Sequence, residues 1–139
     1  MANPNIVGVT SIYGESIGEA LTTTVTTDIL TVAANKVLKI NSISVCNTNA
    51  TTATDVTVAV VKAGFTSSGV GSGEDNAGTF GLCSTLSCPA DDVLLVLEKP
   101  IYLMESDVLE AGANPATADI FISYEVIDDA KKGIKWQNY

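Results

Sequence analysis

The side chains in this sequence that could do chemistry are acidic, and one group of them follows a long apolar segment. Glu105, Asp107 and Glu110 lie in the second half of the stretch VLLVLEKPIYLMESDVLEAG, residues 93–112. On an extended strand Glu105 and Asp107 would share a face, where two carboxylates can act as a general acid and a general base, as in glycosidases. The alternative is that they keep the exposed rim of two core strands soluble and block edge-to-edge pairing. We favour the rim, with the two strands joined at Lys99-Pro100.

A second acidic group lies in the glycine-rich segment 65–78. Glu74, Asp75 and Asn76 carry oxygen ligands of the kind that Ca²⁺ prefers. They lack the alternating spacing that delivers several carboxylates to one ion. We therefore expect a mobile, solvated loop and no metal site.

The sequence lacks the residues on which most other chemistry depends. It contains no His and no Arg, and it has no nucleophile elbow, no phosphate-binding loop and no CxxC motif. A formal charge of −9 without Arg argues against binding to nucleic acid. No stretch has the length of a membrane span, and the first residues do not form a targeting signal. We expect a protein that is not an enzyme, holds no cofactor and contacts neither nucleic acid nor membrane.

The composition favours a single domain with neighbours. A chain of 139 residues can bury roughly two-thirds of its unfolded surface in one core. Only 17% of the residues are charged, so Thr, Ser, Ala and Gly must cover much of the surface, and such a surface favours interfaces. The three cysteines, Cys46, Cys83 and Cys88, are predicted to be free and buried, since Cys83 and Cys88 would lie about 16 Å apart on one strand.

The hydrophobic pattern has the period of two that is typical of β-strands. Val56, Val58 and Val60 fall on one face of their segment, and the even-numbered residues 120–126 fall on one face of theirs. Residues 36–47 change parity between Ile40 and Ile43, which predicts a bulge near Asn41-Ser42. Residues 22–33 form another β-rich segment, and SIGEAL (16–21) alone has helical character.

Turn signals separate these segments. They lie at 47–54, 65–78, 89–92, Lys99-Pro100 and 111–115. Seven or eight short strands with such spacing predict an all-β domain, an antiparallel β-sandwich or jelly-roll-like fold, over residues 13–130. Residues 1–12 are predicted to form an extended N-terminal arm, and residues 131–139 a basic, aromatic C-terminal tail.

The two ends are the predicted interface with partners. The arm is too apolar for a free tail, so it either packs on its own domain or reaches a neighbour. The tail KKGIKWQNY holds three lysines and no acid, whereas residues 1–130 carry a formal charge of −12, so the tail suits an acidic partner or another copy. A frayed, solvated terminus is the alternative. The predicted interface residues are Asn5, Ile6, Val7, Val9, Ile12, Tyr13, Lys131, Lys132, Lys135, Trp136 and Tyr139.

The order of several segments resembles a known family. NPNIVGVTSIYG is followed by KVLKINSISVCN, then by CPADDVLLVLEKPIYLMESDVLEAGA, and finally by ISYEVID. This order is similar to that of small virion structural proteins of tailed phages, especially those infecting cyanobacteria and marine bacteria. The similarity covers residues 3–128 and leaves out the tail from residue 130.

The resemblance implies a bacteriophage structural protein without catalysis. It implies a multi-copy capsid cement or decoration protein that is located in the virion after assembly in the host cytoplasm. The implied partners are the major capsid protein, other virion proteins and further copies of the chain in a homo-oligomer. Alternatives are a neck or tail component, including fibre or baseplate, and a carbohydrate-binding β-sandwich. Its shared motif positions would be structural turn and edge residues: Pro89, Asp91, Asp92, Pro100, Tyr102, Glu105 and Asp107.

Overall fold

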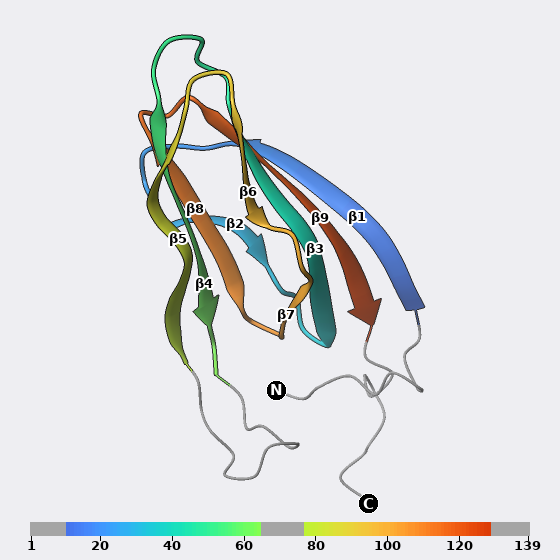
Figure 1. Ribbon diagram of the computed structural model, residues 1–139. Coiled ribbons are helices and arrows are strands. Elements are labelled where there is room, and N and C mark those ends of the chain that lie inside the picture. Colours follow the sequence, from blue (N-terminus) through green and yellow to red (C-terminus); the bar gives the residue numbers. More distant parts are fainter. Residues whose placement is uncertain (1–10, 65–76, 129–139) are drawn as a thin grey trace, which may run out of the picture.

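The computed structural model describes residues 11–64 and 77–128, and this part of the chain is all β-structure (Figure 1). The strands are β1 (Ser11–Ala20), β2 (Thr27–Thr31), β3 (Lys36–Asn47), β4 (Thr54–Lys62), β5 (Gly78–Cys88), β6 (Val93–Leu97), β7 (Ile101–Leu103), β8 (Val108–Asn114) and β9 (Ala118–Asp128). They form two antiparallel sheets that pack face to face, which confirms the predicted β-sandwich.

The strand order is that of a jelly roll. The first sheet, sheet A, has the order β1-β9-β3-β6, and β7 pairs with β3 beyond β6. The second sheet, sheet B, has the order β2-β8-β4-β5. If β6 and β7 are counted as one interrupted strand, the eight strands have the orders 1-8-3-6 and 2-7-4-5, two interleaved Greek keys.

The core lies between the sheets and includes the residues that the alternation predicted. Val56 and Val58 of β4 are fully buried, and Val60 nearly so. The even-numbered side chains of β9 from Ile120 to Val126 are also buried, opposite them. In β3 the register shifts between Ile40 and Ser42, so the predicted bulge is confirmed. The bulge lets β3 bury Leu38, Ile40, Ile43 and Val45 on one face despite their different parity.

Two local predictions were wrong. Residues 16–21 are not helical, because Ser16–Ala20 belongs to β1, which pairs with β9 over ten consecutive residues. The turn predicted at 111–115 begins later, since β8 continues to Asn114 and the chain turns at Pro115–Thr117. In both segments sheet pairing overrides a local preference set by small residues.

The segment 93–112 also differs from the expectation of two core strands. The predicted turns at 89–92 and Lys99-Pro100 are confirmed, but β6 and β7 both pair with β3 at the margin of sheet A rather than with each other. Val93 and Leu95 are more than half exposed. The five-residue apolar run is therefore an edge strand with an exposed apolar face.

Gly112 of β8 lies directly against the backbone of the chain before β2. A Cβ atom at this position would lie 2.7 Å from the Thr24 carbonyl oxygen and 2.7 Å from the Val25 Cα atom. Both neighbours are backbone atoms and cannot rotate away. We expect Gly112→Ala to lower the free energy of unfolding by about 1–3 kcal/mol in chemical denaturation. Gly81→Ala is the control, because a Cβ there would meet nothing within 4 Å.

Candidate interaction surface

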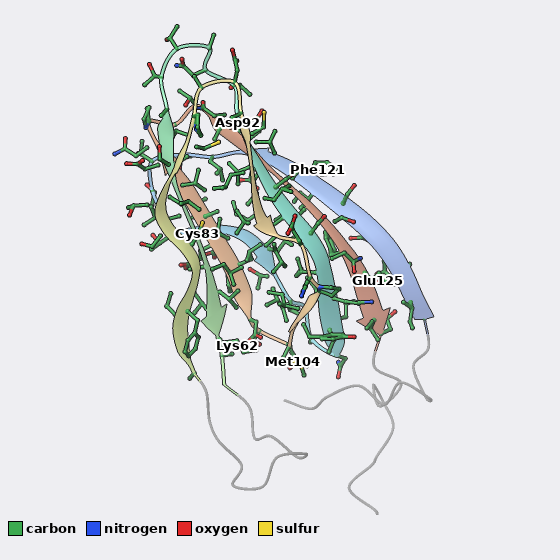
Figure 2. The ribbon with its side chains drawn as sticks, viewed as in Figure 1. Lys62, Cys83, Asp92, Met104, Phe121 and Glu125 are labelled. Atoms are coloured by element: carbon green, nitrogen blue, oxygen red, sulfur yellow. The ribbon has the colours of Figure 1, made fainter. Side chains whose placement is uncertain are left out.

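Asp107 is a buried structural carboxylate and not part of an exposed rim. Its side chain has no solvent-accessible surface and pairs with Lys62 at the end of β4. One carboxylate oxygen accepts a hydrogen bond from the Met104 amide at 2.8 Å, and the other accepts one from the Ala63 amide at 3.0 Å. Lys62 and Met104 lie at the same end of the sandwich in Figure 2. Asp107 thus ties the β7–β8 turn to the end of β4.

The three acids of this segment do not converge on one site. Glu105 lies in the turn after β7, and its carboxylate accepts a hydrogen bond from the Asn35 amide at 2.7 Å. Glu110 lies within β8, opposite Asp28 and Ala59. The prediction that Glu105 and Asp107 share a strand face was wrong, because a turn and not a strand connects β7 to β8. Glu105 and Asp107 instead each accept hydrogen bonds from backbone amides.

Asn47 is a structural centre that the sequence did not reveal. It is fully buried at the end of β3. Its amide nitrogen donates to the carbonyls of Thr52, Cys88 and Pro89 at 2.8–3.2 Å. Its amide oxygen accepts from the Asn49 amide and the Thr117 hydroxyl at 3.1 and 3.0 Å. One side chain therefore joins three connections at this end of the sandwich, and nothing in the pattern NTNATT distinguishes it from an ordinary polar loop.

The outward-facing surface of sheet A, here called the A face, combines small residues with exposed apolar side chains. Cross-strand pairing places Gly18, Phe121, Ser44 and Leu95 in one row across β1, β9, β3 and β6. The next row towards the Asn47 end holds Ala20, Asp119, Cys46 and Val93. Phe121 is 53% and Leu95 59% exposed. Such a cluster of exposed apolar groups among small residues is typical of a protein–protein contact.

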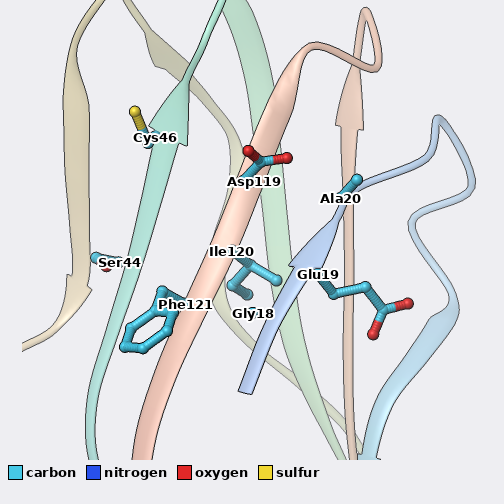
Figure 3. A pocket seen from close by; sticks show the side chains of 8 residues that line it. All are labelled: Gly18, Glu19, Ala20, Ser44, Cys46, Asp119, Ile120 and Phe121. Atoms are coloured by element: carbon cyan, nitrogen blue, oxygen red, sulfur yellow. The ribbon is translucent and has the colours of Figure 1, made fainter. Parts of the chain in front are cut away.

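A shallow hollow of about 390 Å³ lies on this part of the A face (Figure 3). Its lining includes Gly18, Ser44, Cys46, Asp119 and Phe121. A Cβ at Gly18 would contact the Phe121 ring at 3.2 Å, so the glycine leaves room for the aromatic side chain. A second hollow, of about 370 Å³, lies beside β7 and includes the half-exposed rings of Phe80 and Tyr102.

Three of the four sheet margins carry features that discourage further strand pairing. β2 has only five residues and a register shift between Asp28 and Leu30. β5 has two register shifts against β4 and a positive φ at Thr85. β6 and β7 are separated by Lys99-Pro100. Short strands, bulges, lysine and proline are the usual protections of a sheet edge.

The fourth margin, β1, has none of these protections. It pairs with β9 over ten residues without a register shift, and it contains neither Lys nor Pro. Every β1 residue except Ile17 is exposed. In the part of the chain that the structure describes, no strand pairs with the other edge of β1. Among the described strands, β1 is thus a long, regular edge with one side unpaired.

Polar side chains fix β1 and β3 against β9. The Ser11 hydroxyl donates to the Asp128 carboxylate at 2.7 Å, and Lys36 pairs with the same carboxylate. The Tyr124 hydroxyl donates to Glu15 at 2.8 Å. Burial and this hydrogen bond raise the pKa of Tyr124 to about 12, so the phenol remains a donor at neutral pH. The hydrogen bond with Asp128 raises the pKa of Lys36, which stays charged.

The predicted interface residues are only partly described. Ile12 and Tyr13 lie in β1 and are 52% and 42% exposed. Ser11 and Ile12, at the end of the predicted arm, pair with Asp128 and Ile127 as part of β1. The remaining predicted residues lie outside the described ranges: Asn5, Ile6, Val7, Val9, Lys131, Lys132, Lys135, Trp136 and Tyr139.

The three cysteines are free, as predicted, but differ in exposure. Cys88 is buried, Cys83 is intermediate and Cys46 is exposed on the A face. The prediction of burial is therefore confirmed for Cys88 only and was wrong for Cys46. Cys46 alternates with the buried Val45 on β3 and therefore points away from the core. Burial is the largest cause that raises the pKa values of Cys83 and Cys88.

We expect one thiol to react well before the others in the folded protein. A thiol-specific chromogenic reagent at neutral pH should modify Cys46 faster than Cys83 or Cys88 by on the order of tenfold or more, because only thiolates react and buried thiols remain protonated. Cys46→Ser should remove the fast phase, and Cys88→Ser should leave it unchanged. Equal rates for all three thiols would contradict the described burial.

No metal or membrane site emerges from the described residues. Within residues 11–64 and 77–128, no group of three or more His, Cys, Asp or Glu side chains could hold an ion. The segment with Glu74, Asp75 and Asn76 lies outside these ranges. The same ranges contain no helix long and apolar enough to cross a membrane.

Comparisons with protein families, with curated proteins and with solved structures found no match to this chain.

Proposed function

We propose that the protein is a non-enzymatic structural component of a tailed-phage virion, a multi-copy capsid cement protein that stabilises the head through protein–protein contacts. Its partners are the major capsid protein and further copies of the chain. The observation that carries the proposal is the A face together with β1. Small residues, exposed apolar side chains and a ten-residue strand edge that no described strand covers lie on one side of the molecule. On a monomer in water such a surface favours aggregation, whereas in a lattice neighbouring proteins cover it.

The fold supports the proposal by analogy only. Jelly rolls are common among viral capsid domains, and they also occur among lectins. The positions of Glu105 and Asp107 bear on the enzymatic alternative. Asp107 and Glu105 each hold backbone amides, so the sharpest enzymatic hypothesis has no pair of carboxylates facing a common space.

The experiment that tests the function is a count of copies per particle. Purified virions of the phage that encodes the chain are analysed by quantitative mass spectrometry against the major capsid protein. On the order of hundreds of copies indicate a cement protein, and about six or twelve indicate a neck or tail component, because such assemblies follow closed symmetry. Absence of the chain from particles would refute the virion role.

Carbohydrate binding is a second candidate, and one observation favours it. The exposed rings of Phe80 and Tyr102 line the hollow beside β7, and aromatic faces are common in sugar sites. A glycan array with and without Ca²⁺ tests this candidate. Binding that Tyr102→Ala abolishes would support a host-attachment role, and an array without hits would exclude it.

We expect the chain ends to matter more for attachment than for stability. Removing residues 1–10 or 131–139 leaves β1 and β9 intact, so the melting temperature should change by less than about 4 °C, equivalent to roughly 1 kcal/mol. Binding to purified particles that lack the protein should fall by about tenfold or more for at least one truncation. Equal losses of binding and of melting temperature would contradict a role of the ends in docking.

A further inference from the structure

We propose that the C-terminal segment 131–139 of a second copy adds to the open edge of β1 as an antiparallel strand. This inference deepens the proposed function, because it rests on self-assembly of many copies and names the contact between two of them. It depends on β1, on the charges of β1 and of the segment, and on the distance between Asp128 and the far end of β1.

The edge of β1 fits an added strand. It is ten residues long, regular and exposed, and it lacks the protections found at the other three sheet margins. A strand that pairs there gains main-chain hydrogen bonds along its whole length, as in other cases of strand addition. The nine residues 131–139 match the length of this edge.

Charge spacing selects one register. Glu15 and Glu19 lie four residues apart and therefore on the same face of β1. Lys131 and Lys135 have the same spacing in the segment KKGIKWQNY. Antiparallel pairing of Glu19 with Lys131 also brings Glu15 opposite Lys135, so both acids meet a base. Directly opposed opposite charges stabilise a strand pair.

The same register fits the other face of β1. It places Trp136 opposite Gly14 and Lys132 opposite Gly18. A Cβ atom at Gly14 would meet nothing within 4 Å, so a large ring has room there. Gly18 borders the hollow that contains Asp119, a carboxylate with no cationic partner among the described side chains. Every residue from 131 to 139 then lies opposite a β1 residue, from Glu19 to Ser11.

The strand must come from another copy. Asp128 pairs with Ser11, so β9 ends beside the start of β1. Glu19 lies eight residues further along, about 27 Å away at roughly 3.4 Å per residue. The three residues from 128 to 131 span at most about 11 Å. Lys131 of the same chain therefore cannot reach Glu19, whereas Lys131 of a neighbour can.

The test uses Trp136, the sole tryptophan of the sequence, in the full-length protein. Its emission and the sedimentation mass are measured over a concentration series. We expect the emission to shift to shorter wavelengths as the mass rises from monomer to dimer or higher. Added salt should weaken this association, because exposed ion pairs are screened. Tryptophan emission that lies at the same short wavelength at every concentration, with the mass of a monomer, would show binding within one chain and overturn the proposal.

Charge reversal identifies the register. Glu15→Lys with Glu19→Lys should weaken association by about tenfold or more, and so should Lys131→Glu with Lys135→Glu. The combined fourfold variant should associate nearly as well as the natural chain. The double change on β1 has two side effects: lysines protect a strand edge by themselves, and loss of Glu15 removes a hydrogen bond to Tyr124. Neither side effect is reversed by changing the lysines of the tail, so a rescue shows that these charges pair. Failure of the rescue in variants that retain the native circular dichroism spectrum would overturn the register.

A matched control makes the same change of charge elsewhere. Asp28→Lys with Asp55→Lys alters two exposed acids of sheet B, and its association should equal that of the natural chain within about twofold. The result of these association experiments does not depend on the number of copies per virion. Self-association without a place in particles would refute the proposed function alone, and hundreds of copies without tail-dependent association would refute this contact alone.

Discussion

Replacing Asp107 with alanine is expected to lower the free energy of unfolding by about 3–5 kcal/mol. The change removes the ion pair between Asp107 and Lys62, a side chain only 14% exposed. It also removes the acceptor of the Met104 and Ala63 amides. Buried amide donors that lose their acceptor are among the costly defects in a folded protein, and the loss of a largely buried ion pair adds to this cost. Urea denaturation followed by circular dichroism measures the loss.

Two comparisons sharpen this prediction. Asp55→Ala removes an exposed acid, so its effect should stay within about 0.5 kcal/mol. Asp107→Asn keeps the shape and one acceptor oxygen but loses the charge, and we expect a loss smaller than that of Asp107→Ala. A loss below about 1 kcal/mol for Asp107→Ala would contradict the buried ion pair and would reopen a functional role for this acid.

Replacing Asn47 with alanine should have the second large effect, a loss of about 3 kcal/mol. The amide group satisfies three carbonyls and two donors from the segments around it, and the side chain is fully buried. Because the three connections at this end share one partner, hydrogen exchange should accelerate in all of them together. Native-state exchange read by mass spectrometry measures this effect.

Asn41→Ala provides the control for Asn47. Asn41 is an asparagine of the same strand, but it is partly exposed and makes one long hydrogen bond to Glu125, at 3.3 Å. Its replacement should cost less than about 1 kcal/mol and leave exchange at the distant connections unchanged. Similar losses for both asparagines would indicate that Asn47 has no special role.

The fold class could be predicted because alternation is a physical requirement of a two-sheet core. A strand that faces a core on one side must bury every second residue, and Val56, Val58 and Val60 show this pattern directly. The bulge at Asn41-Ser42 was also predictable, since a parity change within one strand needs an extra residue. Such statements require only the local sequence.

Other features could not be predicted because they depend on which strands meet. β1 buries almost nothing, so it shows no clear alternation, and its small residues suggested a helix over 16–21. The run VLLVL appeared to be core because apolar runs usually are, yet β6 lies at a margin and turns Val93 and Leu95 outward.

The two buried polar centres were hidden for the same reason. Asp107 and Asn47 have polar types and turn-rich surroundings, which normally indicate solvent. Their burial results from partners distant in the sequence: Lys62 is 45 residues from Asp107, and Thr117 is 70 residues from Asn47. A single sequence shows the residue types but not these pairings.

The placement of the chain ends has a consequence for use of the protein as a carrier. Ser11 pairs with Asp128, so the first and last described residues lie side by side, while Asn47 and the connection 48–53 lie at the opposite end of the twelve-residue strand β3. A foreign epitope grafted into the exposed tip of that connection, at Ala50-Thr51, would project away from whatever surface anchors the termini. Antibodies could then reach the graft on an intact particle, and the amide of Asn47 would keep the base of the graft in place.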